Sequence, residues 1–450
     1  MSLRTFSTSE TSRQVEPDSR LPVTRASYQA FAADLLTGLR ALHAEHGPIA
    51  ALDDGSQRVV FLFSPEFNQQ VLSDPGTYHA RFFAIRGPKK SAQRRLTSGL
   101  LSMNGEQHRR NRRMVKQPFG LPAIATYGPA IGKLTAELLN SWRVGQTIDL
   151  EDEMRRFMLR VTSTVLFGFD HADQAYRLGD MLAAWVGMNH RLGTGALVPH
   201  DFFNEHYEDL LAFAEQLENE ILELIHQRRR QPETGSDVLS ILVRAHDGEG
   251  GLTDEELVGQ AAVLFGAAHM TTAHSFTWTL LLLAQHPPIM RRLWAELATY
   301  DQLAVCPNGS VGGDAETLLD RVIKESMRIL PASAYSQRVN MEAVRIGPLD
   351  LPRGTGIVFT PLVVHHLPEL YPRQQRFDPD RWIGFKPTSY EYLPFGAGPR
   401  MCIGGPLALG ILRTVLPKIL TRYRLQLAAD AEINAQVEST MLSPVDGVPM

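Results

Sequence analysis

The sequence predicts a mainly α-helical protein with a minor β region, and three observations support this fold class. Apolar residues recur with helical spacing at 27–45, 128–145, 150–168, 204–230, 254–285, 316–329 and 405–424. Runs of β-branched and aromatic residues, cut by Gly and Pro, occur near residue 60 and at 342–362, so strands are few. The longest helical segment is apolar on nearly all sides, which implies burial through the core of one large domain.

The composition is that of a globular protein with a large core. The chain has 450 residues, of which 44% are hydrophobic and 21% charged, and its formal net charge is −4. This near balance gives no case for nucleic acid as a partner. Two cysteines favour a reducing compartment, so we expect a cytoplasmic location. The polar N-terminus lacks an apolar run, so we expect disorder at 1–20, one domain at 21–450 and no membrane anchor.

The segment 254–285 is predicted to be the central helix. Thr253 and Glu256 have the spacing of a capping box, and the prolines after His286 end the segment. At about 1.5 Å per residue, such a helix is roughly 48 Å long. Its middle, GAAHMTTAHS at 266–275, carries small and polar residues where a buried helix normally carries bulky ones.

The segment 393–410, LPFGAGPRMCIGGPLALG, reads as a glycine-rich turn that leads into a helix near Pro406. Cys402 lies just before this helix, where the helix dipole and free N–H groups favour a thiolate. Glycines in this turn allow unusual φ angles and a close approach of the backbone to a flat or bulky group. They are Gly396, Gly398, Gly404 and Gly405. An isolated Cys-x-Gly is more often a structural cysteine in a turn.

This cysteine belongs to a longer pattern, F-G-x-G-x-R-x-C-x-G. The pattern is filled by Phe395, Gly396, Gly398, Arg400, Cys402 and Gly404. It resembles the haem-ligand loop of the cytochrome P-450 superfamily, of the soluble bacterial type. The resemblance implies a single catalytic domain of that fold with haem b, iron protoporphyrin IX, as cofactor. It makes Cys402 the thiolate axial ligand of the iron, Phe395 a shield for the sulfur, and Arg400 a propionate ligand. Gly396 and Gly404 would adjoin the haem.

The segment 104–119, NGEQHRRNRRMVKQPF, resembles the H-x-x-x-R helix of the same family. The resemblance implies that His108 and Arg112, one turn apart, bind haem propionates through charge-assisted hydrogen bonds. Arg338, in SAYSQRVN, matches a further propionate-binding position of the family. Three other cations of the segment are expected to point outward, where they form a solvated face or dock an acidic electron donor. These are Arg109, Arg113 and Lys116.

Glu325 and Arg328, three residues apart, lie on one helix face. Alone, they would be a surface ion pair worth about 0.2–0.5 kcal/mol. In the family, however, this E-x-x-R joins an arginine from a later F-x-P-x-R segment, and Arg381 in FDPDRW supplies it. The resemblance therefore implies a structural network of three charges.

The middle of the central helix aligns with the family signature A/G-G-x-D/E-T-T/S. Ala268 would then adjoin the haem, and Thr271 would supply the oxygen-side hydroxyl, although a threonine can also bond to an i−4 carbonyl. Met270 stands where the family has an acid, and a thioether cannot donate a proton. Proton delivery is left to ordered water, a polar group on the substrate or His269.

These expectations combine into a monooxygenase that inserts one atom of dioxygen into a lipophilic small molecule, a specialised metabolite or a fatty-acid- or terpenoid-like compound. We expect a monomer that receives electrons from a ferredoxin or flavodoxin-type donor with its reductase. Met270 raises the alternative of a peroxide-driven peroxygenase, and a catalytically silent haem-binding protein is the third reading. The segments 81–103 and 332–336, with Phe265 and His269, are predicted to shape the substrate cavity. Within 81–103, Phe82, Phe83 and Leu100 suggest that this cavity is apolar.

Overall fold

The structure is a computed structural model that describes residues 22–55, 57–81, 85–168, 172–192, 205–231, 235–247, 250–299 and 316–450. The predicted disorder at 1–20, the predicted cavity residues Phe82 and Phe83, and Cys306 lie outside these ranges. The prediction of one domain at 21–450 stays a prediction. The main hydrophobic core does draw on residues from Tyr28 to Met450.

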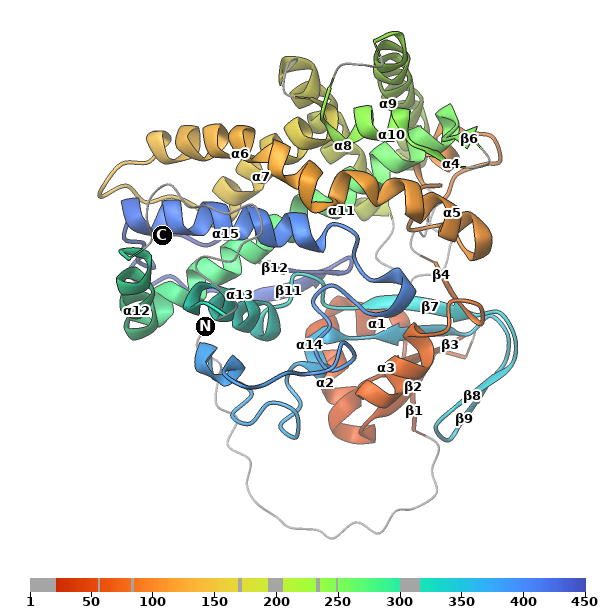
Figure 1. The fold of residues 1–450 in the computed structure, drawn as a ribbon. Coiled ribbons are helices and arrows are strands. Elements are labelled where there is room, and N and C mark those ends of the chain that lie inside the picture. The colour runs from red at the N-terminus through yellow and green to blue at the C-terminus, as the bar shows by residue number, and fades with distance from the viewer. Residues whose placement is uncertain are drawn as a thin grey trace, which may run out of the picture.

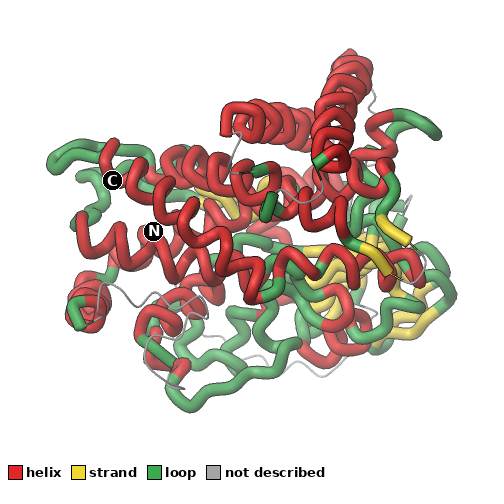
Figure 2. Tube along the Cα trace, turned by 45° about the horizontal axis from the view of Figure 1, so that its top comes forward, coloured by secondary structure: helices red, strands yellow, loops and turns green. Residues whose placement is uncertain are grey.

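Helices build most of the molecule, as the sequence predicts, and the main sheet lies at one end of it (Figures 1 and 2). The helices are α1 (Tyr28–Ala33), α2 (Leu35–His46), α3 (Pro65–Leu72), α4 (Ala92–Leu96), α5 (Gly105–Val115), α6 (Leu121–Ser141), α7 (Leu150–Phe167), α8 (Ala172–Leu192), α9 (Glu205–Arg230), α10 (Val238–Arg244), α11 (Asp254–Gln285), α12 (Pro287–Leu297), α13 (Leu318–Ile329), α14 (Pro361–Val364) and α15 (Gly405–Arg422). In the ranges that the structure describes, no helix combines the length and apolar content needed to cross a membrane.

The main sheet has six strands in the order β1-β2-β3-β10-β7-β4. β10 runs parallel to β3, with Gly356 opposite Val59, and antiparallel to β7. Three two-stranded sheets pair β5 with β6, β8 with β9 and β11 with β12. The strands are β1 (Val23–Arg25), β2 (Ile49–Asp53), β3 (Arg58–Leu62), β4 (Tyr78–Ala80), β5 (His246–Asp247), β6 (Gly250–Gly251), β7 (Ser336–Asn340), β8 (Val344–Ile346), β9 (Leu349–Leu351), β10 (Gly356–Phe359), β11 (Ala435–Glu438) and β12 (Met441–Pro444). The strands predicted near 60 and within 342–362 are thus confirmed.

The central helix α11 is confirmed with its predicted ends. The Thr253 hydroxyl accepts from the Glu256 backbone N–H at 3.2 Å, and the Glu256 carboxylate accepts from the Thr253 N–H at 3.0 Å. The helix packs along α7 through the core. At Gly259 it touches the segment after α4 backbone to backbone, because a Cβ on Gly99 would lie 2.2 Å from the Gly259 oxygen.

The helices differ from the prediction in several places, and the 21-residue helix α8 is the longest one that was not predicted. The segment 27–45 divides into α1 and α2 because the Asp34 carboxylate accepts from the Thr37 N–H at 3.1 Å and caps a new helix. α6 begins at Leu121 and continues through Pro129. α12 was not predicted, since the prolines after His286 were interpreted only as a stop signal, although Pro also favours a first helical turn.

Candidate functional site

The turn before α15 has the backbone that its glycines predict at two positions. Gly396 and Gly398 have φ values of 66° and 69°, and a Cβ on Gly398 would lie 2.2 Å from the Leu72 carbonyl oxygen. The prediction of unusual φ is wrong for Gly404 and Gly405. Gly404 has a φ of −86° because it caps α15 in helical geometry, and Gly405 is the first residue of that helix.

Cys402 lies at the N-terminus of α15, held by a hydrogen bond of 2.8 Å from its backbone N–H to the Phe395 carbonyl. Its side chain is accessible although the residue lies deep in the protein. Burial raises the pKa of the Cys402 thiol, whereas the N–H groups of Gly404 and Gly405 and the charge on Arg112 act to lower it. The predicted helix-terminus effect on the thiol is therefore present but outweighed. A bound metal ion would supply the positive charge that the thiolate still needs.

Four basic residues from three parts of the chain meet beside this turn. His108 and Arg112 come from α5, Arg338 from β7 and Arg400 from the turn itself. Arg112 donates to the Met401 carbonyl at 2.6 Å. Burial and then the charge on Arg400 lower the pKa of His108 to about 4 and that of Arg338 to about 10. These shifts show that the four groups act on one another.

In the part of the chain that the structure describes, this basic cluster has no carboxylate partner. Burial and then Arg112 lower the pKa of Arg400 to about 10, and burial lowers the pKa of Arg112 against the raising effect of Cys402. Among the described residues, no Asp or Glu pairs with these arginines, and the buried Nε of Arg400 has no hydrogen-bond partner. Buried cations that repel one another are stabilised by an anion. The cluster therefore fits a ligand with acidic groups, such as the propionates of haem.

The middle of α11 keeps an accessible face inside an otherwise buried helix. Ala267 is exposed and Ala268, Met270 and Thr271 are half-buried. The Thr271 hydroxyl donates to the Ala267 carbonyl at 2.8 Å, which is the i−4 bond that the sequence left open. The small residues of GAAHMTTAHS thus create a patch on a core helix that a ligand can approach.

Phe265 and His269 face away from that patch, and the prediction that they shape a substrate cavity is wrong. The Phe265 ring is fully buried and stacks on Phe167 of α7 at 6.3 Å between centroids. The His269 Nε2 lies 3.1 Å from the Arg155 carbonyl oxygen, also on α7. Burial lowers the pKa of His269 to about 4, so it is neutral near pH 7. These positions also argue against His269 as the proton donor.

The predicted network of three charges is present and closed. The Glu325 carboxylate accepts from Arg328 at 2.9 Å through both oxygens and from Arg381 at 3.0 Å. The side chains of Glu325 and Arg328 are fully buried. The Trp382 indole N–H completes the carboxylate shell at 3.1 Å. Each charge has its partners within the protein, so this network has a structural role.

Sequence reasoning missed a buried chain of amides between α5 and α11. The Gln260 Oε1 accepts from the Leu100 N–H at 3.0 Å, and its Nε2 donates to the Asn111 Oδ1 at 3.1 Å. The Asn111 Nδ2 in turn donates to the Glu256 carboxylate at 3.1 Å. The signal in the sequence was the one glutamine within LVGQAAVLF, a polar side chain in an apolar helix segment.

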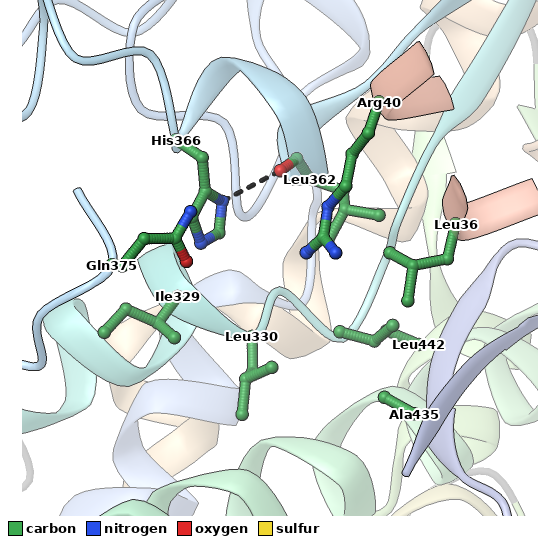
Figure 3. A pocket seen from close by; sticks show the side chains of 9 residues that line it. All are labelled: Leu36, Arg40, Ile329, Leu330, Leu362, His366, Gln375, Ala435 and Leu442. Carbon is green, nitrogen blue, oxygen red and sulfur yellow. Dashed lines mark hydrogen bonds between the residues drawn. The ribbon is translucent and has the colours of Figure 1, made fainter. Parts of the chain in front are cut away.

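A small cavity of about 30 Å³ lies elsewhere, between α2, α13 and the β11–β12 hairpin (Figure 3). It is lined by Leu36, Arg40, Ile329, Leu330, Leu362, His366, Gln375, Ala435 and Leu442. The His366 Nδ1 lies 2.9 Å from the Leu362 carbonyl oxygen, and burial lowers the pKa of His366 to about 3. This volume has room for about two waters. None of the residues of the basic cluster lines it.

Comparison with known proteins assigns the chain to a family. The description of the family that matches residues 20–446 is cytochrome P-450. The chain is 32% identical over 406 residues to cyclooctat-9-en-7-ol 5-monooxygenase of Streptomyces melanosporofaciens, covering 85% of this chain and 83% of that protein. It is 27% identical to pentalenene oxygenase of Streptomyces avermitilis, with 89% of each chain covered.

Solved structures agree on the fold. Retinoic acid bound cyanobacterial CYP120A1 superposes with a TM-score of 0.77 at 22% identity, covering 91% of this chain and 92% of that one. The haem domain of cytochrome P450DA gives a TM-score of 0.77 at 21% identity, with 93% and 92% covered. The predicted fold class is confirmed. An extensive sequence match, the same fold and a cysteine at the loop position of the motif together mean that the chain belongs to the cytochrome P-450 family of monooxygenases.

Proposed function

We propose that this monooxygenase inserts one oxygen atom from dioxygen into a lipophilic terpenoid, using haem b bound through the Cys402 thiolate. The observation that carries the proposal is an accessible thiol beside a partly buried basic cluster that has no carboxylate partner among the described residues. Cys402 would hold the iron, and His108, Arg112, Arg338 and Arg400 would hold the propionates. Bound haem supplies the activation of dioxygen.

The residues around the haem position would exclude water and control access to the Cys402 sulfur and to the haem. Phe395 packs against the start of α15, where a Cβ on Gly405 would lie 3.4 Å from its ring, and from there it would shield the Cys402 sulfur. Gly396 and Gly404 have no side chain that would obstruct the haem. On the opposite side, the small side chain of Ala268 would let the flat haem approach α11. The motif supports these proposed roles.

Proton supply is the step in which this chain departs from its family. Thr271 holds a proton at Oγ1, now shared with the Ala267 carbonyl, and would turn it toward the oxygen side. Met270 has no proton to give. Because His269 is bound to the Arg155 carbonyl, ordered water or a polar group of the substrate would return a proton to the Thr271 hydroxyl.

The terpenoid class rests on the names of the relatives. Cyclooctat-9-en-7-ol 5-monooxygenase and pentalenene oxygenase are named for terpenoid substrates. The test is a titration of the haem-loaded protein with cyclooctat-9-en-7-ol, pentalenene and a fatty acid of similar size, followed by product analysis. A spectral shift and a hydroxylated product with a terpenoid, and neither with the fatty acid, support the proposal. The reverse result contradicts it.

Electrons would arrive from a separate ferredoxin or flavodoxin-type protein at the outer face of α5. Arg109, Arg113 and Lys116 are exposed there, as the sequence predicts. An acidic donor would be attracted to them in a salt-dependent manner. The double variant Arg113→Glu/Lys116→Glu should slow reduction by a bacterial ferredoxin at low salt and leave reduction by dithionite unchanged. An unchanged ferredoxin rate would reject this surface.

A peroxide-driven peroxygenase is the second candidate, because Met270 removes the usual acid. The retained Thr271 favours the use of dioxygen. Product formed with hydrogen peroxide alone should be compared with product formed with NADPH, a ferredoxin and its reductase. Turnover confined to peroxide would replace the monooxygenase proposal. Ligand-induced spectral shifts without product from either oxidant would instead indicate a silent haem-binding protein.

A further inference from the structure

Asn104 occupies the N-cap position of α5 but does not cap the helix. Asparagine at this position normally accepts from a backbone N–H of the first turn, and Asn104 makes no such bond. Its Oδ1 instead accepts from the Ala80 N–H at 2.9 Å and from the Arg400 Nη2 at 2.7 Å. Its Nδ2 donates to the Ala80 carbonyl at 3.2 Å.

The exchange with Ala80 fixes the orientation of the amide. One end must donate to the Ala80 carbonyl and the other must accept from the Ala80 N–H, so the oxygen is the atom that faces Arg400. Ala80 lies in β4 directly opposite Arg338 of β7. A single side chain therefore connects the helix of His108 and Arg112, the strand pair of Arg338 and the turn of Arg400.

The hydrogen-bond acceptors that this arrangement offers to Arg400 are uncharged. Its Nη2 donates to Asn104 and to the Met103 carbonyl, while its buried Nε has no partner among the residues described. A carboxylate in place of the amide would form a charge-assisted pair with Arg400 and neutralise it. The amide fixes the guanidinium and leaves its positive charge available.

We propose that Asn104 is a positioning residue for the haem: it orients Arg400 toward a propionate and, being neutral, leaves the charge of Arg400 to that propionate. The inference rests on the proposed haem site. It predicts that the size of the side chain at 104 matters less for cofactor retention than its polar atoms and its charge.

The test measures the rate of haem transfer from the purified holoprotein to an excess of apomyoglobin. Asn104→Leu keeps the volume and removes the polar atoms, and Asn104→Asp keeps the shape and adds a charge. Gln107→Glu is the matched control, since it makes the same amide-to-acid change at an exposed position of α5. Both Asn104 variants should release haem about tenfold faster, the factor that corresponds to about 1.4 kcal/mol, and Gln107→Glu should stay within about twofold of wild type.

A double-mutant cycle with Arg400→Gln separates positioning from a general structural effect. If Asn104 acts through Arg400, Asn104→Leu should add little to the haem release of Arg400→Gln. The midpoint potential gives a second readout, because the added charge should lower it in Asn104→Asp and leave it unchanged in Asn104→Leu. Fully additive effects, or an Asn104→Asp variant with the release rate and potential of wild type, would overturn the inference. A wild-type protein without a thiolate-type carbon monoxide spectrum would instead reject the haem site itself.

Discussion

Two of the buried groups of charges in the described part of this molecule, the Glu325 network and the basic cluster beside Cys402, differ in how their charges are compensated. At Glu325, one carboxylate meets Arg328 and Arg381, and backbone carbonyls such as that of His365 accept the remaining guanidinium protons. Beside Cys402, the arginines meet carbonyls, an amide and one another, and no Asp or Glu of the described ranges pairs with them. The first group is complete within the protein, so it stabilises the fold. The second fits an anion that the protein itself does not supply among its described residues, which supports the proposed haem site.

Removal of the Cys402 thiol should have the largest effect on the site formed by Cys402 and the basic cluster, which we call the open site. Cys402→Ser should abolish the thiolate-type absorption of the reduced carbon monoxide complex, because the hydroxyl is a poor substitute for the thiolate ligand. Cys306→Ser, a change in the one other cysteine of the chain, should leave that spectrum intact. Persistence of the spectrum in Cys402→Ser would refute the assignment of the iron ligand.

Breaking the closed network should reduce stability. Glu325→Gln leaves the buried guanidinium of Arg328 without its carboxylate, and such a loss costs about 3–5 kcal/mol of unfolding free energy. Asp380→Asn is the control, because its pair with Arg292 is 39% and 49% exposed and is worth about 1 kcal/mol or less. Urea unfolding measures both variants. Equal losses in the two would contradict the contrast between closed and exposed pairs.

Lower pH should reduce the free energy of unfolding through His366, which lies close to Arg328 of the closed Glu325 network. Burial, and then Arg328, lower the pKa of His366 to about 3, whereas the unfolded chain binds that proton near pH 6.5. The unfolded state thus binds more protons as the pH falls, and stability declines from about pH 6.5 toward the folded pKa. Between pH 7 and 5, the His366 contribution is up to about 2 kcal/mol.

The variant His366→Gln tests this contribution. Its unfolding free energy should decline less between pH 7 and 5 than that of the wild type, measured by urea titration at both pH values. Its Gln keeps an amide that can donate to the Leu362 carbonyl, which His366 contacts at 2.9 Å. The same decline in both proteins would show that other groups carry the acid sensitivity.

The smallest expected effect concerns proton supply at the open site. Met270→Glu restores an acid beside Thr271, and the fraction of NADPH converted into product should rise about twofold or more if protons limit the reaction. Product and NADPH consumption are measured together with a ferredoxin and its reductase. Met270→Gln, which is polar but not acidic, is the control. Equal coupling in both variants and the wild type would mean that water already serves Thr271.

The motifs predicted much of this arrangement because each had a fixed spacing and a chemical reason. His108, Arg112, Arg338 and Arg400 are brought together as the resemblance implies, and the Glu325 network is present. The side to which a helical residue points was harder to predict. His269 is next to Met270 in sequence, yet the helix turns it toward Arg155 of α7.

Contacts between distant segments could not be predicted from local patterns. Asn104 resembles an ordinary N-cap in the sequence, and only the fold shows that Ala80 and Arg400 compete successfully for its amide. Gln260 gave a weak signal as a polar residue in an apolar helix, but its partners come from positions about 150 residues away. Such bonds depend on topology, which single motifs do not specify.

The backbone contact between Gly99 and Gly259 has a consequence for engineering this enzyme. No side chains separate the two segments there, so the main chains themselves set the spacing between α11 and the loop that leads to α5. Enlarging either glycine would wedge that loop off the helix and displace Asn104 with it. Libraries that aim to change substrate preference should keep this pair fixed and vary the accessible face of α11 at Ala267 and Met270.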